Sequence, residues 1–328
     1  MPSAIHSTGN AALLFLLLAA ADQQPVSARG GEAIPEYHVD ALVNISRYPI
    51  DQLQAVEYGL LMNAKRTSLK ETGVASFPGF LASDAVAAAA DEAVRSSPTA
   101  WITDSEHNAW QTERNRSLPT THLANLFMRT RVASVAFDEI GPTLRALYES
   151  PELLSFLSDL LGRQLFRLAD PLGACSINVF RDGWDHAWHF DESEYTVTLS
   201  LQQAEEGGDF LFTTPLRTEQ ADLALEQVAS VIREKTEYDF VTPPRPDAEG
   251  SSSSASESPQ AAGDIPVRTA PFAPGTLQVF AGRYSLHAVT RTSGELERLV
   301  AVLCFATEPG VRNSPAVQQM FWGRTIGE

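Results

Sequence analysis

The stretch WHFDESEYTVTLSLQ, residues 188–202, starts with an indole, an imidazole and a carboxylate within four positions. From residue 195 onward it alternates strictly between apolar and polar side chains, which is typical of a β-strand. Residues two apart in an extended chain point to the same side. His189 and Asp191 can therefore converge on one point in space, an arrangement that suits a metal ion and that a hydrophobic core does not need.

The alternation leaves two interpretations of the strand open. Odd positions from 195 to 201 are apolar, and even positions from 196 to 202 are polar. The apolar side is expected to face a core. The polar side either lines an internal cavity or meets solvent.

The composition is that of a globular protein. Of 328 residues, 44% are hydrophobic and 20% are charged, and a chain of this length can fold as one domain or two. With 24 basic against 41 acidic residues, the formal net charge of -17 argues against a nucleic-acid partner and against docking on anionic lipid. Cys175 and Cys304 are the two cysteines, which excludes a disulfide scaffold and a cysteine-based zinc site, and we expect both to be free core thiols.

The N-terminal residues have the features of a leader. The uncharged run AALLFLLLAAA, residues 11–21, is too short to span a bilayer and precedes Val26-Ser27-Ala28, a small-x-small cleavage pattern. We predict a signal peptide over residues 1–28, and with it a secretory or secreted location. Because no Lys or Arg precedes the apolar run, a transit leader or a dispensable extension stays open, with a cytoplasmic or organellar location. No other stretch is long enough to cross a membrane.

Residues 29–162 are predicted to form a helical N-terminal support region. Apolar side chains recur at helical spacing over residues 51–72, and Gly73 ends that helix. A second helix, rich in alanine, starts at the cap Ser83-Asp84. In SPELLSFLSDLLG, residues 150–162, the first serine is the N-cap, the proline takes the first helical position and the glycine ends the helix.

After residue 162 the sequence changes to short β-rich runs separated by Gly, Asp and Pro. We predict a β-barrel or sandwich of roughly eight short strands over residues 163–328. Residues 243–264 are rich in Ser, Ala and Pro and cannot bury enough apolar surface to order themselves. We therefore expect a disordered insertion between strands there.

A second histidine completes a candidate metal site. His287 lies in FAGRYSLHAVT, residues 280–290, close to the β-rich run that precedes it. Two imidazoles and one carboxylate, from His189, Asp191 and His287, form the facial triad that holds Fe(II) and leaves adjacent positions open. Zinc is the competing metal, although a hydrolytic zinc site also needs a nearby general base.

Arg298 follows His287 by eleven residues and opens the apolar run RLVAVLCFAT. The turn RTSGE between them predicts that the two residues lie on adjacent antiparallel strands. A guanidinium in that place can grip a carboxylate through two parallel hydrogen bonds. Arg298 either binds the far carboxylate of a dicarboxylate cosubstrate, which we favour, or is a surface residue paired with Glu295 or Glu297.

Together these motifs resemble the Fe(II)/2-oxoglutarate-dependent dioxygenases. The matching stretches, between residues 188 and 310, are WHFDESEYTVTLSLQ, EEGGDFLF, PGTLQVFAGRYSLHAVT and RLVAVLCFATEPG. A tighter resemblance, from ISRYPID near residue 45 to FWGRT at residues 321–325, is to the ArpA-like group, which includes halogenases and hydroxylases of free amino acids. The fold implied by the resemblance is α+β, with a double-stranded β-helix (jelly-roll) core and a helical N-terminal layer.

The resemblance implies an enzyme in which His189, Asp191 and His287 hold Fe(II) and Arg298 holds the cosubstrate 2-oxoglutarate. O2 is then the oxidant, and ascorbate is an accessory reductant. Family halogenases replace the carboxylate ligand with a small residue, so that chloride can take its place. Because this chain keeps Asp191, the resemblance implies hydroxylation of a small molecule, with an amino acid or a derivative as the leading class.

Three further residues, His186, Glu192 and Trp322, match or partly match positions that contact the amino-acid substrate in those relatives. The alternative for His186 and Trp322 is packing, at the strand entry and in the C-terminal core. Cys304 stands where the relatives have a threonine, so the substrate can differ. Arg283 is either a second anion contact or, as we favour, the structural partner of an acidic neighbour.

Two other functions remain open. The chain is a protein or peptide hydroxylase of the secretory pathway if the leader directs it there. A non-catalytic, cupin-like binding barrel would keep ligand residues without turnover, but retention of all four key residues argues against such decay. The sequence does not indicate the substrate, the carbon attacked or the oligomeric state.

Overall fold

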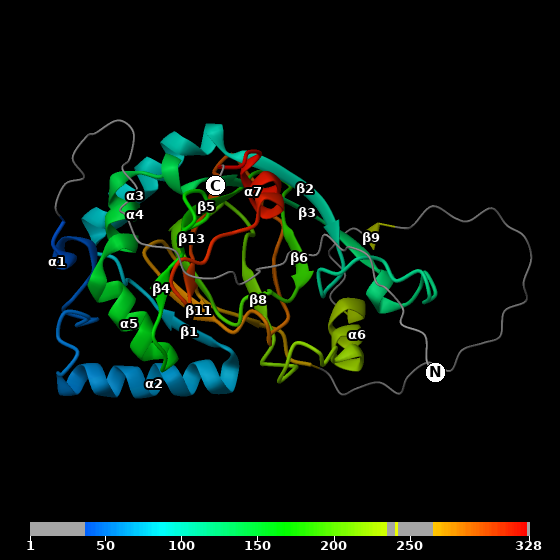
Figure 1. Cartoon of the computed structure of the whole chain (residues 1–328), viewed down its shortest axis with the longest axis horizontal. Coiled ribbons are helices and arrows are strands. Elements are labelled where there is room, and N and C mark those ends of the chain that lie inside the picture. Colours follow the sequence, from blue (N-terminus) through cyan, green and yellow to red (C-terminus); the bar gives the residue numbers. More distant parts are fainter. Residues whose placement is uncertain (1–36, 235–239, 242–264, 327–328) are drawn as a thin grey trace, which may run out of the picture.

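Two antiparallel β-sheets form the centre of the molecule, and helices surround them (Figure 1). The computed structural model describes residues 37–234, 240–241 and 265–326. The signal peptide predicted for residues 1–28 and the insertion predicted for residues 243–264 both lie outside the described residues. Within the described part of the chain, no helix has the length and apolar character that crossing a membrane requires.

The larger sheet has eight strands, and its path runs β1-β11-β7-β13-β5-β3-β2, with β9 added beside β3. The strands are β1 (Val74–Phe77), β2 (Trp101–His107), β3 (Phe127–Val135), β5 (Cys175–Phe180), β7 (Thr196–Gln202), β9 (Phe240–Val241), β11 (Leu277–Phe280) and β13 (Arg298–Leu303). β7 pairs with β11 on one side and β13 on the other. The alternating stretch of the sequence is therefore a strand flanked on both sides within this sheet.

The smaller sheet has the strand order β10-β8-β12-β6. It contains β6 (His186–His189), β8 (Phe210–Phe212), β10 (Arg268–Thr269) and β12 (His287–Val289), and a separate pair joins β4 (Phe166–Arg167) to β14 (Phe305–Ala306). From β5 to β13 the chain passes repeatedly between the larger and the smaller sheet. This alternation is the strand pattern of a jelly roll. The predicted mixture of helices with antiparallel sheet is confirmed.

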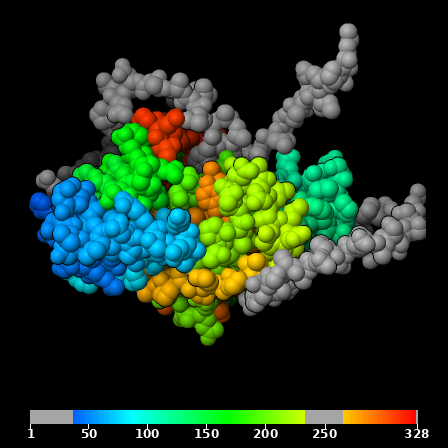
Figure 2. Space-filling view, turned by 90° about the horizontal axis from the view of Figure 1, so that it is seen from below, coloured from blue at the N-terminus to red at the C-terminus, as the bar shows by residue number. Residues whose placement is uncertain are grey.

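Five helices pack on the outer side of the larger sheet. The α-helices of the described residues are α1 (Val39–Leu42), α2 (Val56–Thr72), α3 (Ser83–Ser96), α4 (Pro142–Glu149), α5 (Pro151–Leu161), α6 (Leu225–Glu234) and α7 (Pro315–Trp322). Helices α1 to α5 share the main hydrophobic core with the larger sheet, whereas α6 lies apart from them and α7 lies beside β2 and β3 (Figure 1). Figure 2 shows the N-terminal helical segment in blue and the α6 region in yellow-green on one face of the molecule.

The apolar side of β7 faces this helical layer. Val197, Leu199 and Leu201 are buried in the main core, and each such side chain stabilises the fold by roughly 1.5–3 kcal/mol relative to exposure. The polar side of β7 consequently faces the smaller sheet. Ser200 and Gln202 line a cavity there. The cavity wall, rather than a solvent-facing strand, is the interpretation that the structure confirms.

The predicted helix ends are partly confirmed. Ser150 caps α5, since its side chain accepts a 3.0 Å hydrogen bond from the backbone N–H of Leu153, and Gly162 ends the helix with φ 64°. Gly73 ends α2 as expected, but α2 begins at Val56. The cap predicted at Ser83-Asp84 is wrong, because the residue at the N-cap of α3 is Ala82 and no side chain caps that end.

The N-terminal half is less helical than the sequence analysis expects. Residues 37–162 supply β1, β2 and β3 to the larger sheet in addition to helices α1 to α5. β2 was missed because most of its side chains are partly or fully exposed, so it carries no run of apolar residues. Helices and strands from this half therefore belong to one core with the β-rich half.

Candidate metal centre

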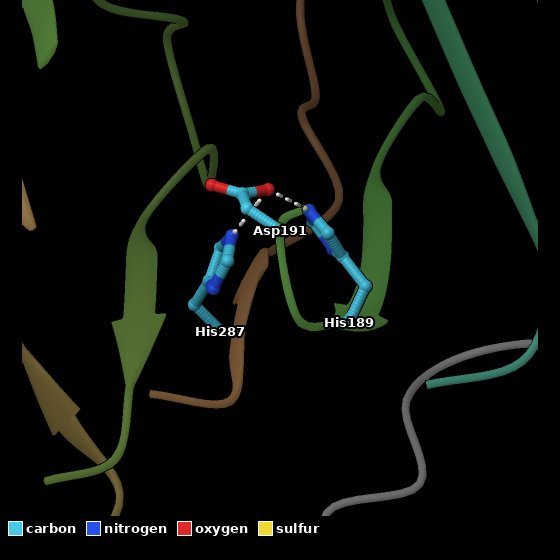
Figure 3. A group of neighbouring side chains, drawn as sticks. All are labelled: His189, Asp191 and His287. Carbon is cyan, nitrogen blue, oxygen red and sulfur yellow. Dashed lines mark ion pairs between the residues drawn. The ribbon is translucent and has the colours of Figure 1, made fainter. Parts of the chain in front are cut away.

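The three predicted metal ligands meet at one point. His189 ends β6, His287 begins β12, and the two are direct partners in the antiparallel register. Asp191 lies two residues beyond β6, and its Oδ1 is 3.3 Å from Nε2 of His189 and 3.4 Å from Nε2 of His287 (Figure 3). One ligand atom from each residue lies within 4.8 Å of the other two. A single ion can therefore be reached by all three side chains.

Each imidazole is oriented by a backbone carbonyl two residues before it. Nδ1 of His189 lies 2.8 Å from the carbonyl oxygen of Ala187, and Nδ1 of His287 lies 2.9 Å from that of Ser285. A carbonyl oxygen only accepts, so Nδ1 carries the proton in both rings. Nε2 is then the unprotonated nitrogen of each ring, with a lone pair available for a metal ion. Both Nε2 atoms face Asp191. Such contacts fix tautomer and ring angle in metal-binding histidines.

The carboxylate of Asp191 is fixed from the other side. Its Oδ2 accepts a 2.6 Å hydrogen bond from the hydroxyl of Thr196, and its backbone N–H donates to the carbonyl of Gly282 at 2.9 Å. A Cβ atom on Gly282 would collide with the Asp191 carboxylate, so this position requires glycine. Sequence reasoning placed Thr196 on the polar side of its strand but did not identify this contact.

The protonation states suit metal binding. Burial works against a charge on Asp191, but the imidazoles of His287 and His189 outweigh it and hold the pKa of that carboxyl well below its usual range. Burial and then the nearby imidazole of His287 lower the pKa of His189. At neutral pH the centre presents an ionised carboxylate and a neutral imidazole at His189, which metal ligation requires.

The ring of His186 stacks on the ring of the candidate ligand His189. The pairing of β6 with β12 shifts between His287 and Val289, where His189 and His186 are the respective partners, so β6 carries a bulge. Residues three apart on a regular strand point to opposite sides, and the bulge instead brings both rings together. The rings of His186 and His189 stack with centroids 4.0 Å apart and planes 14° apart. His186 thus lies beside a candidate metal ligand.

His107, which the sequence analysis missed, packs edge-on against both stacked rings. Its centroid is 5.7 Å from that of His186 and 5.6 Å from that of His189. Its ring nitrogens bond to the Asn108 carbonyl at 3.0 Å and to the Thr130 hydroxyl at 2.8 Å. Burial lowers the pKa of His107 to about 4, so it is a neutral packing partner. No sequence spacing connects it with the other histidines.

Arg298 is a buried cation, and the nearby carboxyl of Asp209 favours its charge. It is 6% exposed, and no described side chain or carbonyl forms a hydrogen bond or ion pair with it. Its guanidinium lies 5.1 Å from the ring centroid of Phe180. Burial lowers its pKa to about 10, which keeps it charged at neutral pH. The surface alternative is not observed, because Glu297 pairs with Arg181 at 2.9 Å and Glu295 is exposed.

A cavity of about 210 Å³ adjoins Arg298. The lining also includes Ser200 and Gln202 from the polar side of β7, and Phe210 from β8. The ring of Phe210 lies 5.8 Å from the ring of His287. Phe210 thus lines the cavity and also lies against His287, and Arg298 lines the same cavity.

The structure also places Glu192, Arg283 and Cys304. Glu192 follows Asp191 directly, and its backbone carbonyl, rather than its carboxylate, accepts a 2.8 Å hydrogen bond from Nε of Arg283. Burial, with the nearby Asp170 and Asp191 carboxyls, raises the pKa of Cys304 to about 12. Both cysteines are free, as expected.

Trp322, at the end of α7, packs against the backbone of Gly173 rather than against the metal centre. Its indole N–H is buried and has no partner among the described residues. Among those residues, no hydrogen bond, ion pair or ring contact joins Trp322 to the three candidate ligands. The structure therefore brings together His186, His189, Asp191 and His287, but it does not show Trp322 at the same point.

Comparison with known proteins gives a family for this arrangement. The family model of Halogenase D (HalD) matches residues 60–235, which is more than half of the 328-residue chain. The chain belongs to the Halogenase D family. The matched region of this HalD member contains His189 and Asp191, whereas His287 and Arg298 lie beyond it. No curated protein matches the chain.

Solved structures similar to this HalD family member include several 2-oxoglutarate/Fe(II) oxygenases. One, a 2OG-Fe(II) oxygenase family member from Burkholderia pseudomallei, has 14% identity and a TM-score of 0.43, covering 77% of this chain and 94% of its own. A Pseudomonas putida prolyl-4-hydroxylase has 14% identity and a TM-score of 0.42, covering 74% and 97%. The epimerase SnoN, solved with Fe3+, alpha ketoglutarate and nogalamycin RO, has 16% identity and a TM-score of 0.46, covering 74% and 82%. Likenesses this distant do not identify the activity of this chain.

Proposed function

We propose that this chain is an Fe(II)- and 2-oxoglutarate-dependent dioxygenase that hydroxylates a small molecule, with an amino acid or a derivative as the leading class. One observation carries the proposal. A triad of His189, Asp191 and His287 lies near a cavity lined by Arg298, a buried cation that forms no hydrogen bond or ion pair with a described residue. Burying a charge is costly unless it is paired, so Arg298 calls for an anionic ligand.

The donor set fits ferrous iron. Two imidazole nitrogens and one carboxylate oxygen are the ligands of the non-haem Fe(II) triad, and they leave other coordination positions free for small ligands. Thr196 keeps Oδ2 of Asp191 occupied, so Oδ1 is the oxygen that faces the ion. Zinc stays the competing metal. Metal content and turnover with each ion distinguish the two.

The cavity beside Arg298 fits a small dicarboxylate. Its volume of about 210 Å³ suits a ligand of a few carbon atoms, and Arg298 can hold a carboxylate by paired charge-assisted hydrogen bonds. Ser200 and Gln202 add polar groups along the wall. When bound, Fe(II) with 2-oxoglutarate and O2 supplies the oxidising chemistry. The protein's residues orient these groups and exclude water.

Hydroxylation is favoured over halogenation by one residue. In the halogenases that this chain resembles, a small residue replaces the carboxylate and makes room for chloride. Here Asp191 fills that place, and its carboxylate is held by Thr196 and flanked by two imidazoles. Halogenation remains the second candidate because the family model is that of a halogenase.

His186 supports a polar small-molecule substrate. Its ring stacks on His189, and neither ring nitrogen forms a hydrogen bond with a described residue. A substrate beside the metal centre can use these nitrogens. Glu192 and Trp322 are proposed as further substrate contacts through the resemblance. A location in the secretory pathway is part of the proposal if the leader is cleaved, and peptide hydroxylation is its alternative outcome.

The test uses purified full-length protein with Fe(II), 2-oxoglutarate, O2 and ascorbate, against pools of free amino acids and pools of peptides. We expect succinate release together with a product heavier by one oxygen atom, in the amino-acid pool. A parallel reaction with added chloride detects a chlorinated product. Oxidation of peptides alone would show that the substrate is a peptide rather than a free amino acid. A protein that binds no iron and releases no succinate would refute the proposal.

A further inference from the structure

Residues 108–112, which are distant in sequence, form hydrogen bonds to the backbone between the candidate ligands His189 and Asp191. Phe190 is the middle residue of His189-Phe190-Asp191. Its N–H donates to the carbonyl of Ala109 at 2.8 Å, and its carbonyl accepts from Nε2 of Gln111 at 2.9 Å. Both backbone polar groups of Phe190 are therefore held by residues 108–112, which lie between β2 and β3.

The backbone of Gln111 is strained. Its φ of 55° lies in the left-handed region, which Gln111 shares with Ala224 among the described non-glycine residues. This conformation is unfavourable for a residue with a side chain and persists where the surroundings impose it, often at functional sites. The strained conformation coincides with the residue whose amide reaches the Phe190 carbonyl.

Asn108 imposes this conformation. It is fully buried, and its Oδ1 accepts hydrogen bonds from the backbone N–H of Trp110 at 3.1 Å and of Thr112 at 3.0 Å. Its Nδ2 donates to the carbonyl of Ala124 at 2.7 Å. The Oδ1 bonds of Asn108 thus close the turn, and its Nδ2 bond attaches the turn to Ala124. Gln111 is presented to Phe190 by a rigid support rather than by a free loop.

The Phe190 peptide needs such support. β6 ends at His189, so beyond it the backbone is held by single contacts, which are those of Phe190 and the 2.9 Å hydrogen bond from the N–H of Asp191 to the Gly282 carbonyl. The carbonyl of Phe190 belongs to the peptide bond that leads into Asp191. Rotation of that peptide would move the Asp191 carboxylate away from the two imidazoles. A metal centre tolerates displacements of only a few tenths of an ångström in its ligands.

We infer that Gln111 is a positioning residue for the metal centre, acting through its hydrogen bond to the Phe190 carbonyl. The inference rests on the proposed function, because it requires that an ion bind to His189, Asp191 and His287. Gln111 itself bonds to none of the three. It sets the angle at which Asp191 meets the ion, and its loss weakens metal binding without removing a ligand.

Two variants and one control test this inference. Gln111→Met keeps the length of the side chain without its amide, and Gln111→Gly removes the amide while relaxing the strained backbone. Gln319→Met makes the same chemical change at an exposed position on α7. Metal-free full-length proteins are titrated anaerobically with Co(II), whose visible spectrum reports the arrangement of its ligands, and then with Fe(II) in competition.

We expect both Gln111 variants to bind metal about 10-fold to 100-fold more weakly than the parent and to shift the Co(II) spectrum. The control is expected to match the parent in both respects. Affinities within about twofold of the parent and an unchanged spectrum in the glycine variant would overturn the inference. Failure of the unaltered protein to bind either ion would instead overturn the metal centre, and this inference with it.

Discussion

Thr196 donates a 2.6 Å hydrogen bond to Oδ2 of Asp191, while Oδ1 of the same carboxylate faces the imidazoles. Thr196 is the first residue of β7, in the larger sheet, whereas the two histidines belong to the smaller sheet. The carboxylate thus connects the two sheets at the metal centre. Its orientation depends on a strand that contributes no metal ligand.

Thr196→Val is expected to weaken Fe(II) binding roughly 10-fold, because valine keeps the shape of threonine but leaves Oδ2 of Asp191 without its donor. The matched control is Thr103→Val, since the Thr103 hydroxyl donates a 3.0 Å hydrogen bond to the Met320 carbonyl at the β2–α7 contact. The control should lose about 1 kcal/mol of stability and keep its metal affinity. Equal metal affinities in the two variants would contradict this role of Thr196.

Asp191→Gly is expected to abolish hydroxylation, because it removes the only carboxylate of the candidate triad. The product mixture is analysed by mass spectrometry, with and without added chloride. Metal binding should weaken but persist through the two histidines. Turnover equal to that of the parent would remove Asp191 from the ligand set.

Arg298→Gln is expected to raise the KM for 2-oxoglutarate about 10-fold to 100-fold, since a charge-assisted hydrogen bond contributes about 1.5–3 kcal/mol. Arg181→Gln is the control, because Arg181 pairs with Glu297 near the same end of β13. The control should leave KM unchanged. Steady-state succinate release gives both values, and a normal KM in Arg298→Gln would place the cosubstrate elsewhere.

Much of the centre could be predicted because its signals are local or carried by unusual residues. His189 and Asp191 are two apart on an extended chain, and Arg298 is a lone cation leading an apolar strand. The two ends of α5 could also be predicted, because Ser150 and Gly162 are local capping signals. In each case the sequence places a chemically distinctive group where short-range geometry already determines its direction.

The contacts that orient these groups could not be predicted, because they join distant segments. Gln111 and Phe190 are 79 residues apart, and no local pattern connects them. The stacking of His186 depends on a bulge in β6, which has no marker in the sequence. β2 was missed because its exposed polar residues resemble a loop. Long-range pairing, rather than local propensity, decides each of these features.

Gln278→Leu is expected to stabilise the ligand-free protein by about 1 kcal/mol. Gln278 is 1% exposed, and neither atom of its amide has a partner among the described residues, so an apolar side chain of similar size removes a desolvation cost. Gln318→Leu is the matched control, because the Gln318 amide bonds to Asp170 at 3.0 Å and to the Ile326 N–H at 3.1 Å. Urea unfolding should show destabilisation of the control. A loss of stability in Gln278→Leu would mean that this amide is satisfied in solution.

The metal-free protein is expected to lose stability as the pH falls from about 7 to about 5. Burial lowers the pKa of His107 to about 4 and also lowers that of His186. In the unfolded chain these imidazoles titrate near pH ~6.5, so below that pH the unfolded state binds more protons than the folded state. Stability is therefore full above this range and declines toward the folded pKa. Urea unfolding midpoints measured from about pH 7 to about pH 5 check this prediction. The stability of His107→Gln should fall less steeply with pH than that of the parent.

In the proposed function, His189, Asp191 and His287 bind ferrous iron, and the guanidinium of Arg298 holds 2-oxoglutarate beside it. Anaerobic titration of the metal-free protein with Fe(II), followed by 2-oxoglutarate, tests it most directly through the visible absorption of the ternary complex. We expect saturable iron binding and an absorption band that appears only when both Fe(II) and 2-oxoglutarate are present, and we expect Arg298→Gln to lose this band at the same cosubstrate concentration. A protein that binds no iron would refute the metal centre, and a band that Arg298→Gln leaves unchanged would refute the role of Arg298.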